Sequence, residues 1–203
     1  QGGKILGSSN RGTITSTVKY PSISSCIQET GGIVGRSQAN SLINRCYNYG
    51  EISNNGQYVG GIAAKVSKTN LFNLINNGNV TSILAEGYSC ASGIVAEINN
   101  ADKKMQFFNC INHGSISSKA KYAIATAAGI CATIKNCFIA NMYNDGSVSA
   151  QRVGGTATAS FEIPLFEKDS NSTLLSSVTF LDDANEFIDS YKETNELLLK
   201  WVK

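Results

Sequence analysis

Apolar and polar positions alternate along this chain in short runs, and the runs recur as a motif. The motif reads Asn-x-Gly-x-(Ile or Val), and a Ser or Thr follows every copy. Short alternating runs are typical of half-buried strands, whereas Asn and Gly are typical of turns. The asparagine and glycine of the five copies are Asn10 and Gly12, Asn48 and Gly50, Asn76 and Gly78, Asn112 and Gly114, and Asn144 and Gly146.

A second motif, in which two small residues precede a short apolar run, lies between successive copies of the first. Its five copies occupy residues 31–35, 60–64, 92–96, 128–132 and 154–158. The second small residue of each copy is a glycine, and these glycines are 29, 32, 36 and 26 residues apart. Strict alternation of two motifs at such periods predicts a repeat protein with insertions in its loops.

Side-chain parity predicts which residues face the interior, because residues two apart share a face of a strand. In the second motif the inward face is expected to carry Ile33, Ile62, Ile94 and Ile130, with Gly35, Ala64, Ala96 and Ala132. The alternate positions are expected to face water: Val34 and Arg36, Ala63 and Lys65, Val95 and Glu97, Cys131 and Thr133. In the first motif Cys46, Leu74, Cys110 and Met142 share the parity of the asparagine, which directs that asparagine inward at a corner.

The two motifs together predict an all-β fold, a parallel β-helix (β-solenoid) of about five rungs over residues 1–160. Two short strands, a corner and a return after about thirty residues describe one coil, and stacked coils bury an apolar face that one coil cannot bury alone. Asn and Gly suit the corners because both tolerate positive φ, and stacked asparagines can form a hydrogen-bonded ladder. We therefore assign them a structural role. No copy has the spacing of a phosphate-binding loop.

The repeats end near residue 160, and residues 161–203 are expected to form a separate C-terminal segment. A loop and a short strand over 174–180 are expected to precede a helix over 183–201, with Asp183 and Glu186 placed as a capping box. One face of that helix is apolar: Ala184, Phe187, Ile188, Tyr191, Leu198 and Val202, with Trp201 nearby. The helix is predicted to cap the solenoid, and a partner-binding helix is the alternative.

Charge separates the same two regions. The net charge of +2 divides into +7 over residues 1–160 and −5 over residues 161–203, which favours docking of the tail on the repeats. A basic body can also attract polyanions, but no aromatic-interleaved basic motif accompanies it, so we expect no nucleic-acid partner. The longest apolar run, residues 123–134, is too short to span a membrane.

The six cysteines are predicted to be free thiols rather than a disulfide framework. Cys46 and Cys110 occupy the same motif position two rungs apart, beyond the reach of a disulfide. A bridge among Cys26, Cys90 and Cys137, or between Cys131 and Cys137, stays open. With no Cys-x-x-Cys pair and a single histidine, His113, we expect neither a metal nor a cofactor.

One column of residues has the spacing of a ligand-binding or tail-docking stripe. The residue before each corner asparagine is Tyr47, Ile75, Ile111 and Tyr143. If these side chains point outward, they form an aromatic and aliphatic ladder suited to stacking sugars or receiving the C-terminal helix. If the corner rotates the chain, they are core, and burial in the coil or beneath the tail is the favoured interpretation.

The paired motifs resemble the Glug-motif repeats of adhesin-like bacterial surface proteins of the Bacteroidetes type, over roughly residues 1–160. The resemblance implies a secreted or cell-surface, non-catalytic module for cell adhesion, which binds an unknown glycan or protein ligand or presents other domains. The start at Gln1, without Met, is expected of an excised or mature fragment. Acidic residues are too scattered over the repeats to form an evident catalytic pair, although a carbohydrate-active β-helix enzyme and a passive structural stalk remain alternatives.

Overall fold

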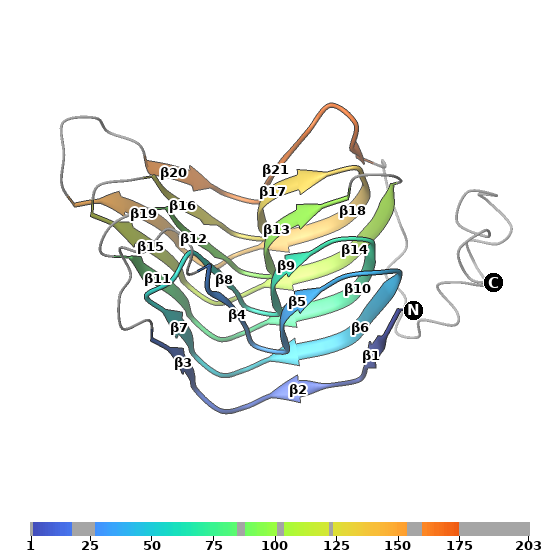
Figure 1. The fold of residues 1–203 in the computed structure, drawn as a ribbon, viewed down its shortest axis with the longest axis horizontal. Coiled ribbons are helices and arrows are strands. Elements are labelled where there is room, and N and C mark those ends of the chain that lie inside the picture. The colour runs from blue at the N-terminus through green and yellow to red at the C-terminus, as the bar shows by residue number, and fades with distance from the viewer. Residues whose placement is uncertain are drawn as a thin grey trace, which may run out of the picture.

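The computed structural model describes residues 2–17, 27–84, 88–100, 104–121, 124–153 and 160–174, and every regular element within them is a β-strand. The strands form four parallel sheets, which we call A to D in the order in which each turn of the chain visits them. Each turn bends between its C and D strands, so sheets B and C form one arm and sheets A and D the other (Figure 1).

Sheets A and D form the first arm. Sheet A holds β1 (Lys4–Leu6), β2 (Ser9–Asn10), β6 (Ser41–Asn48), β10 (Thr69–Asn76), β14 (Met105–Asn112), β18 (Cys137–Asn144) and β22 (Thr173–Leu174). Sheet D holds β5 (Val34–Ser37), β9 (Ala63–Val66), β13 (Val95–Asn99), β17 (Cys131–Lys135) and β21 (Phe166–Lys168).

Sheets B and C form the second arm. Sheet B holds β3 (Ile14–Ser16), β7 (Ile52–Asn54), β11 (Val80–Leu84), β15 (Ile116–Ala120) and β19 (Val148–Arg152). Sheet C holds β4 (Glu29–Gly31), β8 (Tyr58–Gly60), β12 (Ser89–Ser92), β16 (Ala125–Ala128) and β20 (Ser160–Ile163). The described part of the chain is thus an all-β parallel solenoid of about four turns, since about four turns join the five strands of a sheet.

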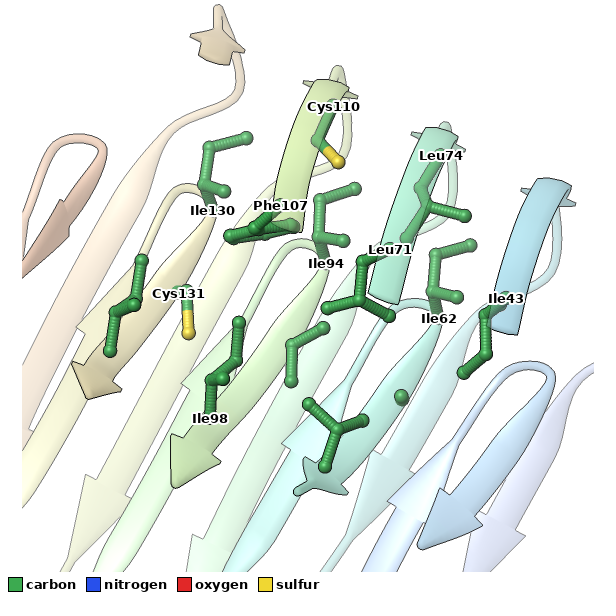
Figure 2. Packing of buried hydrophobic residues seen from close by; sticks show 14 of the residues in the cluster. Ile43, Ile62, Leu71, Leu74, Ile94, Ile98, Phe107, Cys110, Ile130 and Cys131 are labelled. Carbon is green, nitrogen blue, oxygen red and sulfur yellow. The ribbon is translucent and has the colours of Figure 1, made fainter. Parts of the chain in front are cut away.

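The interior is divided between the two arms. Side chains of sheets A and D form the larger cluster, in which Leu71 and Ile94 of one turn pack with Phe107 of the next (Figure 2). Sheets B and C enclose a thinner one: Ile52, Val59, Val80, Ala91, Ile116 and Ala127. A third, small cluster lies on the re-entrant side, where the outer faces of C and D meet: Cys90, Ala96, Ala128 and Ala132, with Tyr58, Tyr88 and Ile163.

Simple parity is wrong at the bend between sheets C and D. Two consecutive N–H groups there donate to one carbonyl of the next turn; the N–H groups of Ile94 and Val95, for example, both lie 3.1 Å from the Ile130 carbonyl oxygen. This kink directs two adjacent side chains inward, so the positions predicted to face water, Val34, Ala63, Val95 and Cys131, pack in or against the A/D interior. Ala96 and Ala132, predicted to face inward, lie in the re-entrant cluster.

The strands continue beyond the last motif at residue 158. β20, β21 and β22 pair with β16, β17 and β18, so the stacking extends to Leu174. The helix predicted over 183–201, and most of the strand predicted over 174–180, lie outside the described residues. The described part of the chain therefore contains no helical cap, and its last strand belongs to sheet A.

Candidate ligand-binding faces

The corner asparagines form a continuous ladder between sheets A and B. The side-chain Nδ2 of each of the first four donates to the Oδ1 of the asparagine one turn later, over 2.7–2.8 Å. The same Nδ2 donates to the carbonyl oxygen of the motif glycine two residues on, as in Asn76 to Gly78 at 2.8 Å. Asn48, Asn76 and Asn112 are fully buried, so these hydrogen bonds satisfy amides that would otherwise be costly to bury.

The corner glycines after Gly12 are required by close approach rather than by positive φ. Among the described glycines only Gly7 has a positive φ, so the dihedral reason expected for the corners does not apply. A Cβ on Gly78 would lie 1.9 Å from the Gly50 carbonyl oxygen, and on Gly61 it would lie 2.5 Å from the Asn76 Cγ. The second motif therefore packs against the ladder of the first, which gives a physical reason for their alternation.

A second asparagine ladder crosses the middle of sheet A, and strand parity does not predict it. Asn73, Asn109 and Asn141 have φ of 52, 57 and 53°, and each donates through Nδ2 to the Oδ1 of an asparagine one turn earlier. Its signal in the sequence is an asparagine three residues before each of the last three corner asparagines. In the second turn Asn44 accepts the bond and Arg45 takes the left-handed position, with φ 54°.

The predicted stripe lies on the outer face of sheet A. Tyr47, Ile75, Ile111 and Tyr143 are directly paired in the register of β6, β10, β14 and β18. The first three are half-buried and Tyr143 is 54% exposed, so Tyr143 is not buried in the coil, and its predicted burial beneath the tail involves residues outside the described ones. The stripe is a column of stacked side chains at about 4.8 Å spacing that is open to solvent at its Tyr143 end.

Polar and aromatic groups flank the stripe one position beyond the asparagine ladder. The guanidinium of Arg11 lies 4.8 Å from the centre of the Tyr49 ring. His113 Nδ1 is 2.7 Å from Asp145 Oδ1, and its ring meets that of Tyr143 edge-on with centroids 6.3 Å apart. The convex corner thus presents aromatic faces beside hydrogen-bonding groups, which is the combination that sugar rings need.

A second candidate face, which the sequence did not reveal, is a hollow of about 290 Å³ over the outer face of sheet D. Arg36, Lys65 and Glu97 come from three successive turns and are paired in register, so their side chains line one column of the hollow. Glu29 and Tyr58 approach from sheet C across the bend, since Glu29 hydrogen-bonds Arg36 and the Lys65 Nζ lies 4.3 Å from the centre of the Tyr58 ring.

Opposite charges are matched within this hollow. Lys65 Nζ lies 2.9 Å from Glu97 Oε1, and Arg36 forms a two-pronged ion pair with Glu29. Burial, and then the neighbouring Glu97, raise the pKa of Tyr58, so its phenol stays protonated at neutral pH. The hollow therefore offers fixed donors and acceptors without a strong net charge.

The described cysteines do not point to chemistry. Cys46, Cys90, Cys110, Cys131 and Cys137 are buried and free, while Cys26 lies outside the described residues. Burial raises the pKa of Cys90 and of Cys137 to about 12, which keeps both as unreactive thiols near neutral pH. The described residues also contain no group of three His, Cys, Asp or Glu side chains that could hold a metal ion.

We compared the chain with known proteins. No protein-family model matches the chain, and neither a curated protein nor a solved structure matches it. In the described ranges there is no helix with the length and apolar character needed to cross a bilayer.

Proposed function

We propose that this chain is a non-catalytic, extracellular module of a bacterial surface protein, and that its stripe binds a glycan or protein ligand in adhesion. The observation that carries the proposal is the outward, in-register column from Tyr47 to Tyr143 on the convex side of the solenoid. The likeness of the two motifs to Glug repeats supports a surface location and presentation of neighbouring domains.

A glycan is the ligand class that this surface fits best. Tyr143 is 54% exposed, and Tyr49, on the neighbouring column, is 45% exposed, so both offer ring faces for stacking. Asp145 and His113 supply hydrogen-bonding groups within the same few ångströms as the Tyr143 ring. Because the stripe is straight and spans several turns, an extended chain of sugars matches it better than one compact molecule.

The experiment is direct binding of mucin and a panel of host oligosaccharides to the full chain. A Tyr47→Ala, Tyr143→Ala double variant is expected to lose about tenfold or more in Kd, because each aromatic contact contributes about 0.5–1.5 kcal/mol beyond its buried area. Phe161→Ala is the matched control, since Phe161 is an equally exposed aromatic side chain on sheet C. Unchanged glycan affinity in a folded double variant would rule out the stripe as the binding surface.

A carbohydrate-active enzyme is the second candidate, and the hollow over sheet D is the observation in its favour. Arg36, Lys65 and Glu97 line it and Glu29 pairs with Arg36 from sheet C, and these are the types of group used by polysaccharide-cleaving β-helices. Two facts oppose catalysis: both carboxylates are held in ion pairs, and the raised pKa of Tyr58 opposes its use as a base. Turnover of an acidic polysaccharide that is abolished in Glu97→Gln would establish the enzyme instead.

A passive stalk is the third outcome of the same measurements. It is distinguished by the absence of both binding and turnover in a folded chain.

A further inference from the structure

Part of the outer face of sheet A, away from the stripe, is buried where strand geometry would place it in water. Leu71 and Phe107 pack in the A/D interior, so the next residues, Phe72 and Phe108, point to the outer face. Phe72 is nevertheless 2% exposed and Phe108 0%, and their ring centroids lie 5.8 Å apart. Four neighbours on the same two outer columns are also buried: Asn44, Asn70, Gln106 and Ala140.

The outer face of sheet B shows what an uncovered face of this solenoid looks like. Thr81 and Ser117, which are paired there, are only partly buried, Ile83 is 51% exposed, and Lys119 is exposed. Small polar and charged side chains dominate that face, whereas phenylalanines stand at the centre of the outer face of sheet A. Residues of this kind and burial require a cover.

We propose that residues 175–203, which lie outside the described residues, cover this face as an amphipathic helix laid along the stack. The last described strand, β22, ends at Leu174 within sheet A and pairs with β18. The segment therefore starts at the last strand of sheet A, the sheet whose outer face carries the buried phenylalanines.

The length of the segment suits this position. A helix over 183–201 contains 19 residues and is about 28 Å long. From β1 to β22 sheet A spans five inter-strand steps, or about 24 Å. One helix running back toward β1 over the columns of Phe72 and Phe108 would thus cross every strand of the sheet, while the stripe lies three residues further along each strand. Its apolar face would meet the two phenylalanines with Ala184, Phe187, Ile188, Tyr191 and Leu198.

Charge and hydrogen bonding favour the same occupant. Residues 175–203 carry six carboxylates and three lysines, whereas residues 1–160 carry a net charge of +7. Lys104 stands at the edge of the face, with Nζ 5.1 Å from the centre of the Phe138 ring. Asn70 is fully buried and its Nδ2 has no acceptor among the described residues, so this face holds a donor that a carboxylate of the segment would satisfy.

Trp201 makes the inference testable in the full chain, because it is the only tryptophan. We expect a blue-shifted Trp201 emission and amide exchange in residues 184–200 slowed about tenfold or more relative to unstructured chain. A Phe187→Asp, Leu198→Asp variant is expected to lose both signals and keep the strand signal in circular dichroism. Asn185→Asp, Ser190→Asp adds the same charge to the polar face and is expected to keep both.

A substitution on sheet A itself tests whether the helix lies over that sheet. Leu42→Glu places a charge on the outer face of sheet A and is expected to red-shift Trp201, whereas Thr81→Glu, on the outer face of sheet B, is expected to leave it unchanged. Equal exchange in the wild type and the Phe187→Asp, Leu198→Asp variant would overturn the proposal. A Trp201 signal insensitive to Leu42→Glu would also overturn it, and so would protection lost on dilution, which would identify a second copy as the cover. None of these outcomes depends on glycan binding.

Discussion

The two asparagine ladders of sheet A use the same side chain for different physical reasons. The corner ladder, from Asn10 to Asn144, has no residue with positive φ, and its value lies in hydrogen bonds between buried amides. The mid-strand ladder of Asn73, Asn109 and Asn141 stands in the left-handed region, where asparagine is tolerated and most residues are strained. A repeated asparagine therefore marks either a hydrogen-bond requirement or a backbone requirement, and substitutions can tell them apart.

The largest loss of stability is expected at a corner glycine, where the backbone of one turn contacts the backbone and the ladder asparagine of the turn before it. Gly78→Ala would place a Cβ 1.9 Å from the Gly50 carbonyl oxygen and 2.9 Å from Asn48 Nδ2, and neither neighbour can move freely. We expect a loss of about 4 kcal/mol or more in the free energy of unfolding, measured by urea denaturation. Gly3→Ala, with no atom near the added Cβ, is expected to change stability by less than about 0.5 kcal/mol.

Removal of one amide from the corner ladder is expected to come next. Asn76→Ala leaves Asn48 Nδ2 without one acceptor and removes the donors to Asn112 Oδ1 and the Gly78 carbonyl. Because these groups are buried, we expect a loss of about 3 kcal/mol. Asn76→Gly is expected to be no better than alanine. A glycine variant clearly more stable than the alanine variant would show that backbone conformation matters at this ladder too.

At the mid-strand ladder the order of the same two variants is expected to reverse. Asn109 has φ 57°, so alanine adds left-handed strain of about 1–2 kcal/mol to the lost hydrogen bonds, whereas glycine does not. Asn109→Gly should therefore be about 1–2 kcal/mol more stable than Asn109→Ala in urea denaturation. Equal stabilities would contradict the distinction between the ladders.

The smallest expected effect is a difference in the free energy of unfolding between two variants at Arg45. Arg45 occupies the left-handed position of the mid-strand ladder, with φ 54°, where later turns have asparagine. Arg45→Asn is expected to exceed Arg45→Ala in free energy of unfolding by about 1 kcal/mol, because both variants lose the contacts of the arginine side chain and only asparagine relieves the strain. Arg45→Ala is the control, since it removes the same side chain and keeps the strain. Equal stabilities for the two variants would exclude backbone strain as the cause.

The sequence predicts the repeated parts of this molecule well. The parallel solenoid, the inward corner asparagines and the column from Tyr47 to Tyr143 all follow from two motifs and strand parity. Parity does not predict the bend between sheets C and D, because one carbonyl there accepts from two consecutive N–H groups and turns both Ile94 and Val95 inward. The hollow depends on that bend, since Glu29 and Arg36 lie on different strands on either side of it.

The two candidate faces also differ in how well the sequence predicts them. Stripe residues share one motif position, so counting from each corner asparagine finds them. The hollow combines unlike residues, Arg36, Lys65 and Glu97, at one position of sheet D, and no repeated residue type marks it. A repeat sequence therefore shows the scaffold clearly and hides the positions where successive turns differ, which are the positions free to acquire specificity.

The direction of the two ladders has a consequence for how such a solenoid grows. Corner asparagines donate toward the C-terminal end, as Asn76 does to Asn112, whereas mid-strand asparagines donate toward the N-terminal end, as Asn109 does to Asn73. Their amide dipoles are therefore opposed and largely cancel, unlike the aligned peptide dipoles of an α-helix. Added turns lengthen the rod without building up a dipole from these side chains along its axis, so its ends attract or repel neighbours only through the residues they display.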